Sequence, residues 1–229
     1  KEAVDKDGFL GIFTGGFTAG AAGISSGIGV MRGIIDSAPD ISKIDVTPTG
    51  YSTTVLAANG EETATLVGQG ANRQYVTIDE IPLDLQHAFV AIEDERFYDH
   101  NGIDLHGIGR AFISGLSKGR FSEGASTITQ QLIKNNVLTS WTSETSFVEK
   151  LQRKIQEQYL ALELEKQVKD KDWILENYMN SVNLGANTLG VQAASKKYFN
   201  KDVSELTLSE ASVIAGITQN PSGYNPITH

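Results

Sequence analysis

The feature that most constrains the fold of this chain is a change of pattern at Pro82. After that proline, apolar residues recur at the spacing of amphipathic helices almost to the end of the chain. The clearest stripe comprises Leu151, Ile155, Tyr159 and Leu162, which would share the core-facing side of one helix. We therefore expect a mainly α protein with helices over residues 83–94, 105–117, 126–135, 147–168, 171–179, 189–198 and 208–217.

The residues before Pro82 favour strands. Two β-prone runs flank Asn59-Gly60, a dipeptide typical of tight hairpin turns. A third β-prone run covers residues 73–78. The sequence thus predicts a small β-hairpin or sheet within residues 47–78, preceded by a linker over residues 35–48 that contains Asp, Ser and Pro.

Residues 8–31 form a run of 24 positions without a charge. A helix of that length would cross the roughly 30 Å hydrocarbon core of a bilayer. We expect a transmembrane helix over residues 8–35, after a short cytoplasmic tail at residues 1–7. Two alternatives stay open, a flexible Gly-rich tail and a buried hairpin of a soluble protein. Small residues recur every fourth position, which would let another helix approach closely: Gly11, Gly15, Ala19, Gly23 and Gly27.

Composition and missing motifs exclude several classes of function. The net charge of −9 disfavours a nucleic-acid partner and a broad electrostatic attachment to anionic lipid, since both need a basic face. The chain has no cysteine, which excludes disulfides and thiolate catalysis. No serine has a lysine three residues later, and there is no P-loop or His-Glu-x-x-His motif. His100 and His106 are six positions apart, a poor spacing for a shared metal.

The first candidate for chemistry is the acidic triplet Glu93-Asp94-Glu95, which ends an apolar helical run. Partial burial makes a carboxylate a better proton acceptor, so an acid in this position suits general base catalysis. Phe97 and His100 follow closely and would place aromatic side chains beside the acids. For the triplet alone, a solvated helix end is the commoner outcome.

The second candidate is the segment from Gly124 to Gln131. Thr127 and Gln130 match a capping box, so Thr127 could simply begin a helix. The same helix N-terminus would offer backbone N–H groups to a phosphate. Lys134 would add a positive charge, and the amides of Gln130 and Gln131 suit sugar hydroxyls or phosphate oxygens.

The third candidate lies on the longest predicted helix. Arg153 and Lys154 precede Glu157 by four and three residues, so their charges share one helix face. One interpretation is an exposed ion-pair face worth about 0.3–0.5 kcal/mol. The other is a cationic pair for a diphosphate, beside a second carboxylate.

Taken in order, these segments resemble the peptidoglycan glycosyltransferase domain of class A penicillin-binding proteins, glycosyltransferase family 51. The family's first motif, Glu-Asp-x-x-Phe-x-x-His-x-Gly, matches Glu93, Asp94, Phe97, His100 and Gly102. The second, Gly-x-Ser-Thr-x-Thr-Gln-Gln, matches Gly124, Ser126, Thr127, Thr129, Gln130 and Gln131. The third, Arg-Lys-x-x-Glu, matches Arg153, Lys154 and Glu157. Residues 174–180 resemble the fourth, with Met179 where Leu is usual, and residues 190–226 are also similar to the family.

The resemblance implies a mainly helical, lysozyme-like fold with a large lobe and a smaller membrane-proximal jaw. Residues 36–82 would form a linker and small β region, and residues 83–229 the glycosyltransferase domain. The implied reaction polymerises lipid II, a disaccharide-pentapeptide on undecaprenyl diphosphate, into β-1,4-linked glycan strands for the cell wall. It would invert the anomeric centre and release undecaprenyl diphosphate.

By position, the resemblance makes Glu93 the general base and Glu157 a second catalytic acid. Lys134, Arg153 and Lys154 match cations near the diphosphate, with or without a divalent cation, Mg²⁺ or Mn²⁺, and no organic cofactor is implied. The residues implied in substrate binding are Asp94, Phe97, His100, Gly124, Ser126, Thr127, Gln130, Gln131, Lys134, Arg153 and Lys154.

The implied partners are lipid II, the growing glycan strand, membrane lipid and cell-wall synthesis proteins, and no nucleic acid. The implied location is the cell membrane, with a single span and the catalytic domain on the extracytoplasmic face. The chain stops at His229, before the family's fifth motif, and has no transpeptidase domain. We therefore expect a C-terminally truncated part of a longer protein that could carry one.

Two other functions were weighed against polymerisation. A lysozyme-like peptidoglycan hydrolase would use Glu93 as an acid, but a hydrolase needs no diphosphate site. Lys134, Arg153 and Lys154 therefore favour transfer. A catalytically silent membrane scaffold is disfavoured because both Glu93 and Glu157 are present.

Overall fold

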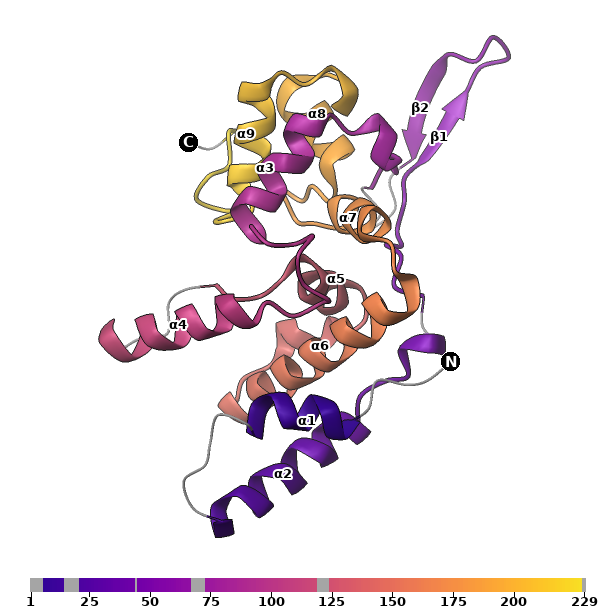
Figure 1. Cartoon of the computed structure of the whole chain (residues 1–229). Coiled ribbons are helices and arrows are strands. Elements are labelled where there is room, and N and C mark those ends of the chain that lie inside the picture. Colours follow the sequence, from indigo (N-terminus) through magenta and orange to yellow (C-terminus); the bar gives the residue numbers. More distant parts are fainter. Residues whose placement is uncertain (1–5, 15–20, 44, 67–72, 119–123, 228–229) are drawn as a thin grey trace. The chain divides into compact units, whose positions relative to one another are not determined.

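The helices after Pro82 form where the apolar spacing predicts them. The computed structural model of the chain describes residues 6–14, 21–43, 45–66, 73–118 and 124–227. Beyond Pro82 its α-helices begin and end within two residues of the predicted ranges, which confirms a mainly α protein. They are α3 (Leu83–Glu93), α4 (Leu105–Lys118), α5 (Ile128–Asn136), α6 (Phe147–Val168), α7 (Lys171–Met179), α8 (Val191–Phe199) and α9 (Leu208–Ile217) (Figure 1).

Capping boxes begin two of these helices. At α6 the Glu149 N–H donates to Ser146 Oγ at 3.1 Å, and the Glu149 carboxylate accepts the Ser146 N–H at 2.9 Å. Thr207 and Glu210 form the same box at α9. The Lys201 ammonium also donates to Glu210 at 2.7 Å, and this contact, with the bonds from Thr207, lowers the pKa of Glu210 to about 2. Each box satisfies N–H groups that a helix start leaves without a partner.

The chain divides into two compact units. Unit 1 comprises Lys1–Val46 and Tyr98–Asp170, and unit 2 comprises Thr47–Phe97 and Lys171–His229. Each unit is therefore assembled from two separate stretches of sequence.

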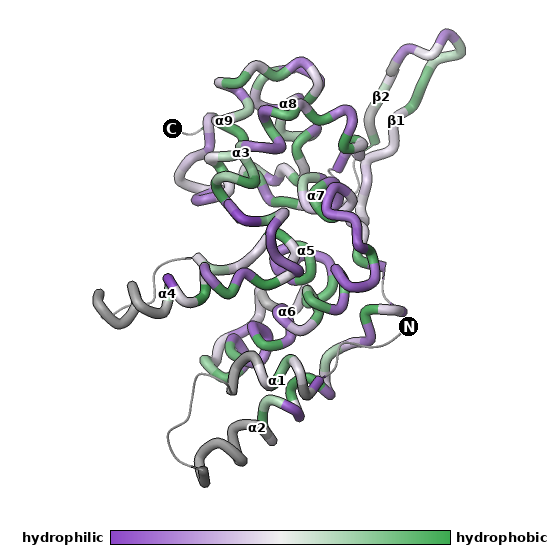
Figure 2. Tube along the Cα trace, viewed as in Figure 1, coloured by the Kyte–Doolittle hydropathy of each residue, from purple (hydrophilic) through white to green (hydrophobic). Residues whose placement is uncertain are grey.

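Unit 1 is built around α6, against which both α5 and α2 (Ala21–Asp36) pack. Ile128 and Leu132 of α5 and Leu160 of α6 are fully buried. In Figure 2 the tube along α6 alternates between apolar green and polar purple, as expected for a helix with one buried face.

The buried face of α6 is not the stripe predicted from apolar spacing. Of that stripe Tyr159 is buried, but Leu151 is 48% exposed and the other two residues are half-buried. The buried face instead carries acids, among them Glu157 and Glu165. The Thr129 hydroxyl donates to Glu165, and cations pair with Glu157. Spacing of apolar residues misses this face because acids that are buried with partners still count as polar.

The N-terminal segment differs from the predicted transmembrane helix over residues 8–35. It forms two shorter helices, α1 (Lys6–Thr14) and α2, with residues 15–20 outside the described ranges. No helix in the described part of the chain is long and apolar enough to cross a bilayer. The two helices pack against each other, and Phe9 and Ile35 are each 1% exposed. The Phe9 ring meets the Tyr159 ring edge-on at 5.7 Å.

Glycine accounts for this difference. Residues 8–31 include eight glycines, and each weakens a helix by about 1 kcal/mol relative to alanine. The same glycines lower the hydropathy of the segment, and among its described side chains Phe9 and Leu10 are buried whereas Val30 is 64% exposed.

Unit 2 contains the predicted hairpin. Strands β1 (Thr53–Leu56) and β2 (Glu62–Leu66) are antiparallel, with Thr53 opposite Leu66. Gly60 in the connecting turn has a φ of +86°, a backbone conformation that glycine adopts without steric cost. Asn59-Gly60 therefore marks the turn correctly.

The third β-prone run does not become a strand. Among its described residues, Arg73 forms a single bridge to Tyr51, and the backbone that follows pairs with the side chains of Glu176 in α7 and of Asn180 just after that helix. The Asn180 amide both accepts from the Val76 N–H at 3.0 Å and donates to the Val76 carbonyl at 2.8 Å. Glu176 accepts the Ile78 N–H at 2.6 Å. These side chains satisfy the groups that a strand ladder would have used.

The core of unit 2 lies between α3 and α9, which pack against each other. Leu85 and Phe89 of α3 and Ile214 of α9 are fully buried. Phe89 also packs edge-on against Tyr178 of α7, with ring centroids 6.0 Å apart. This packing positions the C-terminal end of α3 beside the end of α9.

Candidate active site

Glu93 is the last residue of α3, and two side chains that follow α9 bind its carboxylate. The Thr218 hydroxyl donates a hydrogen bond to Glu93 Oε1. The Gln219 amide donates to the same oxygen, with 3.0 Å between Nε2 and Oε1. Glu93 is half-buried. Neutral donors therefore orient the carboxylate while part of the side chain stays accessible.

Asp94 and Phe97 shape the turn after Glu93. Asp94 is 6% exposed, its N–H donates to the Val90 carbonyl at 2.9 Å, and its carbonyl accepts the Phe97 N–H at 2.8 Å. Phe97 is fully buried, and Lys171 Nζ lies 4.4 Å from the centroid of its ring. This cation–π contact and the turn hydrogen bonds hold the segment in place.

Tyr178 lies close enough to both acids for their charges to act on it. The residue is fully buried, and burial, followed by the charges of Glu93 and Asp94, raises the pKa of Tyr178 well above its usual value. The phenol therefore keeps its proton at neutral pH and adds no negative charge beside Glu93.

Thr127 caps the N-terminus of α5 and so forms one half of the predicted capping box, because the Gln130 side chain points to the Gly102 carbonyl instead. Thr127 Oγ1 accepts the Gln130 N–H at 3.2 Å, and the Thr127 hydroxyl donates to the Gly102 carbonyl at 2.7 Å. The Gln130 side-chain amide approaches the same carbonyl at 3.5 Å. Thr127 and Gln130 are each 1% exposed. Both side chains join the Gly102 turn to α5, and their part in substrate binding stays a prediction.

Of the described glycines, Gly102 in this turn lies closest to the backbone of α6. Its φ is +87°, and a Cβ there would lie 2.6 Å from the Ala161 carbonyl oxygen. Gly102→Ala is expected to lower the free energy of unfolding by about 2–3 kcal/mol, because a positive φ and overlap with backbone are both costly. Urea unfolding of variant and wild type measures the difference.

Gly109→Ala is the matched control, since a Cβ at Gly109 in α4 would meet no atom within 4 Å. Alanine is the better helix former, so we expect unchanged stability or a gain of up to about 1 kcal/mol. A Gly102→Ala variant as stable as the wild type would refute the close approach to α6.

Glu157 is fully buried and binds two cations of its own helix. Arg153 Nη1 donates to Glu157 Oε1, and Lys154 Nζ lies 2.7 Å from Oε2. The shared helix face predicted from their spacing is confirmed, but the face is not exposed, because the Glu157 side chain is 1% exposed. Lys154 also donates to Ser126 Oγ at 2.8 Å. The second and third sequence motifs thus meet within unit 1.

Glu144 completes this cluster. Both of its carboxylate oxygens accept from Arg153 Nε, at 2.7 and 2.9 Å. Burial lowers the pKa of Arg153, but the hydrogen bond to Glu144 and the charge of Glu157 outweigh it and raise that pKa above its usual value. The Arg153 side chain is 15% exposed and that of Lys154 is 42% exposed. Lys154 is therefore the cation that a dissolved anion reaches more readily.

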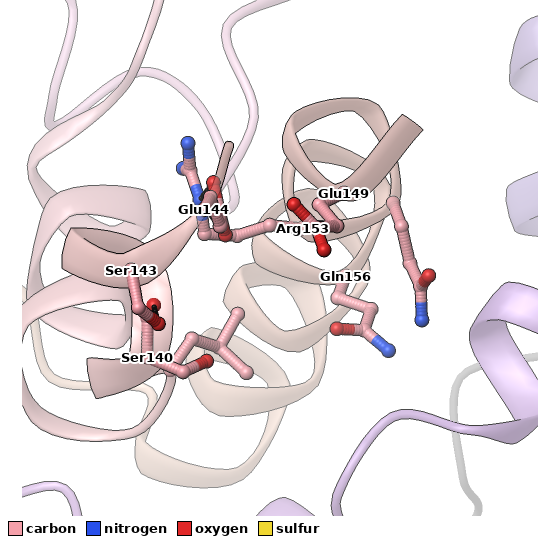
Figure 3. Close-up of a pocket in the computed structure, with 8 residues that line it drawn as sticks. Ser140, Ser143, Glu144, Glu149, Arg153 and Gln156 are labelled. Carbon is pink, nitrogen blue, oxygen red and sulfur yellow. Dashed lines mark hydrogen bonds and ion pairs between the residues drawn. The ribbon is translucent and has the colours of Figure 1, made fainter. Parts of the chain in front are cut away.

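A pocket of about 280 Å³ adjoins Arg153 in unit 1 (Figure 3). Two acids line the pocket, Glu144 and Glu149, and both already have partners. Glu144 binds Arg153, and Glu149 accepts the backbone N–H groups of the two residues at positions 145 and 146. Arg153 is its one lining residue that the sequence predicts in substrate binding. The pocket is lined by Leu138, Ser140, Ser143, Glu144, Glu149, Gln152, Arg153 and Gln156.

The remaining predicted site residues lie elsewhere in unit 1. Gln131 and Lys134 are half-buried on α5, with Lys134 in its last turn. His100 is half-buried, and Gly124 is exposed. Glu93, Asp94 and Phe97 belong to unit 2 and the other predicted site residues to unit 1.

Sequence reasoning missed four residues of these groups. Thr218 and Gln219 lie 125 and 126 positions from Glu93, and no spacing relates them to it. Tyr178 lies within residues 174–180, which resemble the fourth motif without a role for this residue, and Glu144 lies in an irregular segment before α6. The similarity of residues 190–226 to the family marked the region around Thr218, but it assigned no role there.

Within the described ranges no three His, Asp or Glu side chains gather as a metal-binding group. The divalent cation therefore stays a prediction, and no chemical step is assigned to it below.

Comparisons with known proteins agree with these motifs. Residues 59–229 match the family model described as Transglycosylase. Penicillin-binding protein 1A of Clostridium botulinum strain Langeland is 42% identical over 224 residues, 95% of this chain and 25% of that protein. Penicillin-binding protein 1F of Bacillus subtilis strain 168 is 44% identical over 178 residues, 78% of this chain and 24% of that protein.

Penicillin-binding protein 1A of Escherichia coli K12 is 42% identical over 207 residues, 90% of this chain and 23% of that protein. The chain thus spans about a quarter of the length of these relatives. The family match covers most of the chain and contains every motif residue named above. This chain therefore belongs to the transglycosylase family, glycosyltransferase family 51, and is homologous to the class A penicillin-binding proteins.

Proposed function

We propose that this chain is a peptidoglycan glycosyltransferase that polymerises lipid II into β-1,4-linked glycan strands in cell-wall synthesis. The observation that carries the proposal is the contrast between two glutamates. Glu93 is half-buried and oriented by neutral donors, whereas Glu157 is fully buried between two cations. Glu93 therefore remains accessible to a substrate hydroxyl, and Glu157 does not.

Glu93 is the general base in this reaction. The 4-hydroxyl of the acceptor sugar gives its proton to Glu93, and its oxygen attacks the anomeric carbon of the donor. The bond from that carbon to the diphosphate breaks, and undecaprenyl diphosphate leaves with the electron pair. Displacement in one step inverts the anomeric centre. A base matters because a neutral sugar hydroxyl is a weak nucleophile.

Nearby cations must stabilise the negative charge that develops on the leaving diphosphate. Lys154 is the best candidate to contact it, being 42% exposed, and Lys134 and Arg153 add positive charge within unit 1. Cations aimed at the oxygens where charge develops stabilise the transition state. Glu157 supports this role by holding the Arg153 and Lys154 side chains in fixed directions.

The donor carries its lipid in the bilayer, so we propose that the chain acts at the extracytoplasmic face of the cell membrane. Lipid II and the growing strand are the substrates. Other cell-wall synthesis proteins and a transpeptidase domain are the partners that we propose. A divalent cation, if it takes part, would accompany the diphosphate.

Incubation of the complete 229-residue chain with fluorescently labelled lipid II in detergent tests the proposal. Long glycan strands and one undecaprenyl diphosphate per added disaccharide are the expected products. Cleavage of finished glycan without polymer would instead support a hydrolase. No polymer under conditions in which the Escherichia coli penicillin-binding protein 1A polymerises would refute the proposed activity of this chain.

A further inference from the structure

Thr218 has two acceptors for one hydrogen. Its Oγ1 lies within hydrogen-bonding distance of Glu93 Oε1 and at 2.7 Å from the Ala215 carbonyl oxygen. A hydroxyl carries a single proton, so it donates to one of these oxygens at a time. Which one receives it depends on the charge of Glu93, because a hydrogen bond to a carboxylate is stronger than one to a neutral carbonyl.

We propose that Thr218 is a positioning residue whose hydroxyl follows the protonation state of Glu93. When Glu93 is ionised, the Thr218 hydroxyl donates to Oε1 and fixes the direction of the carboxylate that will accept the proton. After Glu93 has taken the proton of the acceptor hydroxyl on Oε1, the Thr218 hydrogen turns to the Ala215 carbonyl. Thr218 Oγ1 then accepts a hydrogen bond from the protonated carboxyl. No bond to carbon forms or breaks at Thr218, and its hydrogen only rotates.

The position of Thr218 makes this rotation possible without movement of the backbone. The residue is the C-cap of α9, and its N–H donates to the Ala215 carbonyl at 3.3 Å. The Ala215 carbonyl belongs to the last turn of α9 and, besides the Thr218 N–H, has a second lone pair that can accept a hydrogen bond. The Thr218 hydroxyl can therefore use this carbonyl as its second acceptor.

Gln219 complements Thr218 by donating to the same oxygen through an amide at 3.0 Å. The nitrogen of an amide only donates, whereas a hydroxyl oxygen can donate or accept. Gln219 Nε2 therefore helps to direct the ionised carboxylate, and the Thr218 hydroxyl is the group that can reverse its hydrogen bond by rotating a single hydrogen.

Two titratable groups are described beside Glu93, namely Asp94 and the phenol of Tyr178. Asp94 follows Glu93 in the chain, and the phenol of Tyr178 on α7 stays protonated because burial and the two acids raise its pKa. The part of α9 nearest Thr218, residues 211–217, contains no titratable side chain. Thr218 does not titrate and contacts the Glu93 carboxylate directly, so a change in the pH dependence after its substitution is expected to act through Glu93.

The inference rests on the proposed function, and Thr218→Val tests it. Valine keeps the shape of threonine but cannot donate. We expect kcat to fall about tenfold, the effect of one hydrogen bond to a charged group, with little change in KM. Loss of a donor to the ionised form disfavours that form, so the acid limb of the rate profile should move to higher pH. Thr218→Ser should restore both values.

Ser212→Ala is the matched control, because the Ser212 hydroxyl donates to the Leu208 carbonyl at 2.8 Å on the exposed side of the same helix. It should leave rate and pH profile unchanged. Wild-type kinetics in Thr218→Val would overturn the proposal. So would a slower variant with an unmoved acid limb that serine does not rescue, since that pattern indicates a purely structural role.

A second measurement separates this inference from the proposed reaction. NMR titration of the Glu93 carboxyl carbon needs no substrate, and in Thr218→Val the transition is expected at higher pH than in the wild type. A shifted titration in a chain that makes no polymer would refute the reaction but keep the role of Thr218. Polymer formation with identical titrations would refute the role of Thr218 alone.

Discussion

Glu93→Gln is expected to lower the rate of lipid II polymerisation by about 10²- to 10⁴-fold, the range that general bases contribute. Glutamine cannot take the proton of the acceptor hydroxyl. Its side-chain oxygen can still accept hydrogen bonds from Thr218 and Gln219, so the packing of α3 on α9 should survive. The measurement is the initial rate of glycan formation, together with a thermal unfolding curve that should match the wild type.

Glu95→Gln is the control for this experiment. Glu95 belongs to the same acidic triplet, but its side chain is 70% exposed and its contact with Arg96 is 3.5 Å long. Exposed ion pairs contribute little, so the rate should change by less than about twofold. Equal polymer yield from Glu93→Gln and wild type would remove Glu93 as the base.

Glu157→Gln should act mainly on folding. Removing its charge leaves Arg153 paired with Glu144 alone and weakens two charge-assisted hydrogen bonds, each worth about 1.5–3 kcal/mol. Arg153 cannot lose its proton to avoid that cost, and its side chain is only 15% exposed. We expect a lower urea midpoint and a loss of polymerisation that accompanies the loss of folded protein and of the ordered Lys154.

Glu149→Gln on the same helix is the matched comparison. Glu149 is exposed and closes the capping box at the start of α6, a position where glutamine serves nearly as well as glutamate. Its urea midpoint should stay close to that of the wild type. If Glu157→Gln unfolds at the same urea concentration as Glu149→Gln, the buried cluster does not stabilise unit 1 as the contacts indicate.

The sequence was a good guide wherever structure depends on neighbours in the chain. Apolar spacing predicted the helices after Pro82, Asn59-Gly60 predicted the hairpin turn, and Thr127 predicted the start of α5. The spacing from Arg153 to Glu157 predicted their ion pair. Each of these features is decided within about four residues, so propensity and periodicity suffice.

Predictions that depended on the surroundings of a segment were less successful. The uncharged N-terminal run suggested one long span, but α1 and α2 bury Phe9 and Ile35 within unit 1. The run at residues 73–78 had the composition of a strand, yet Asn180 supplies its hydrogen bonds. In both cases the deciding partner lies more than 100 residues away in the chain.

The sequence alone determined the family, the order of the motifs and the identity of the two glutamates, because these are carried by residue type and spacing. The tertiary structure decided how the two glutamates differ. Packing of α3 on α9 brings Thr218 and Gln219 to Glu93, and Glu144 joins the buried cluster around Glu157. No local pattern encodes these contacts, since they form only when distant segments share one core.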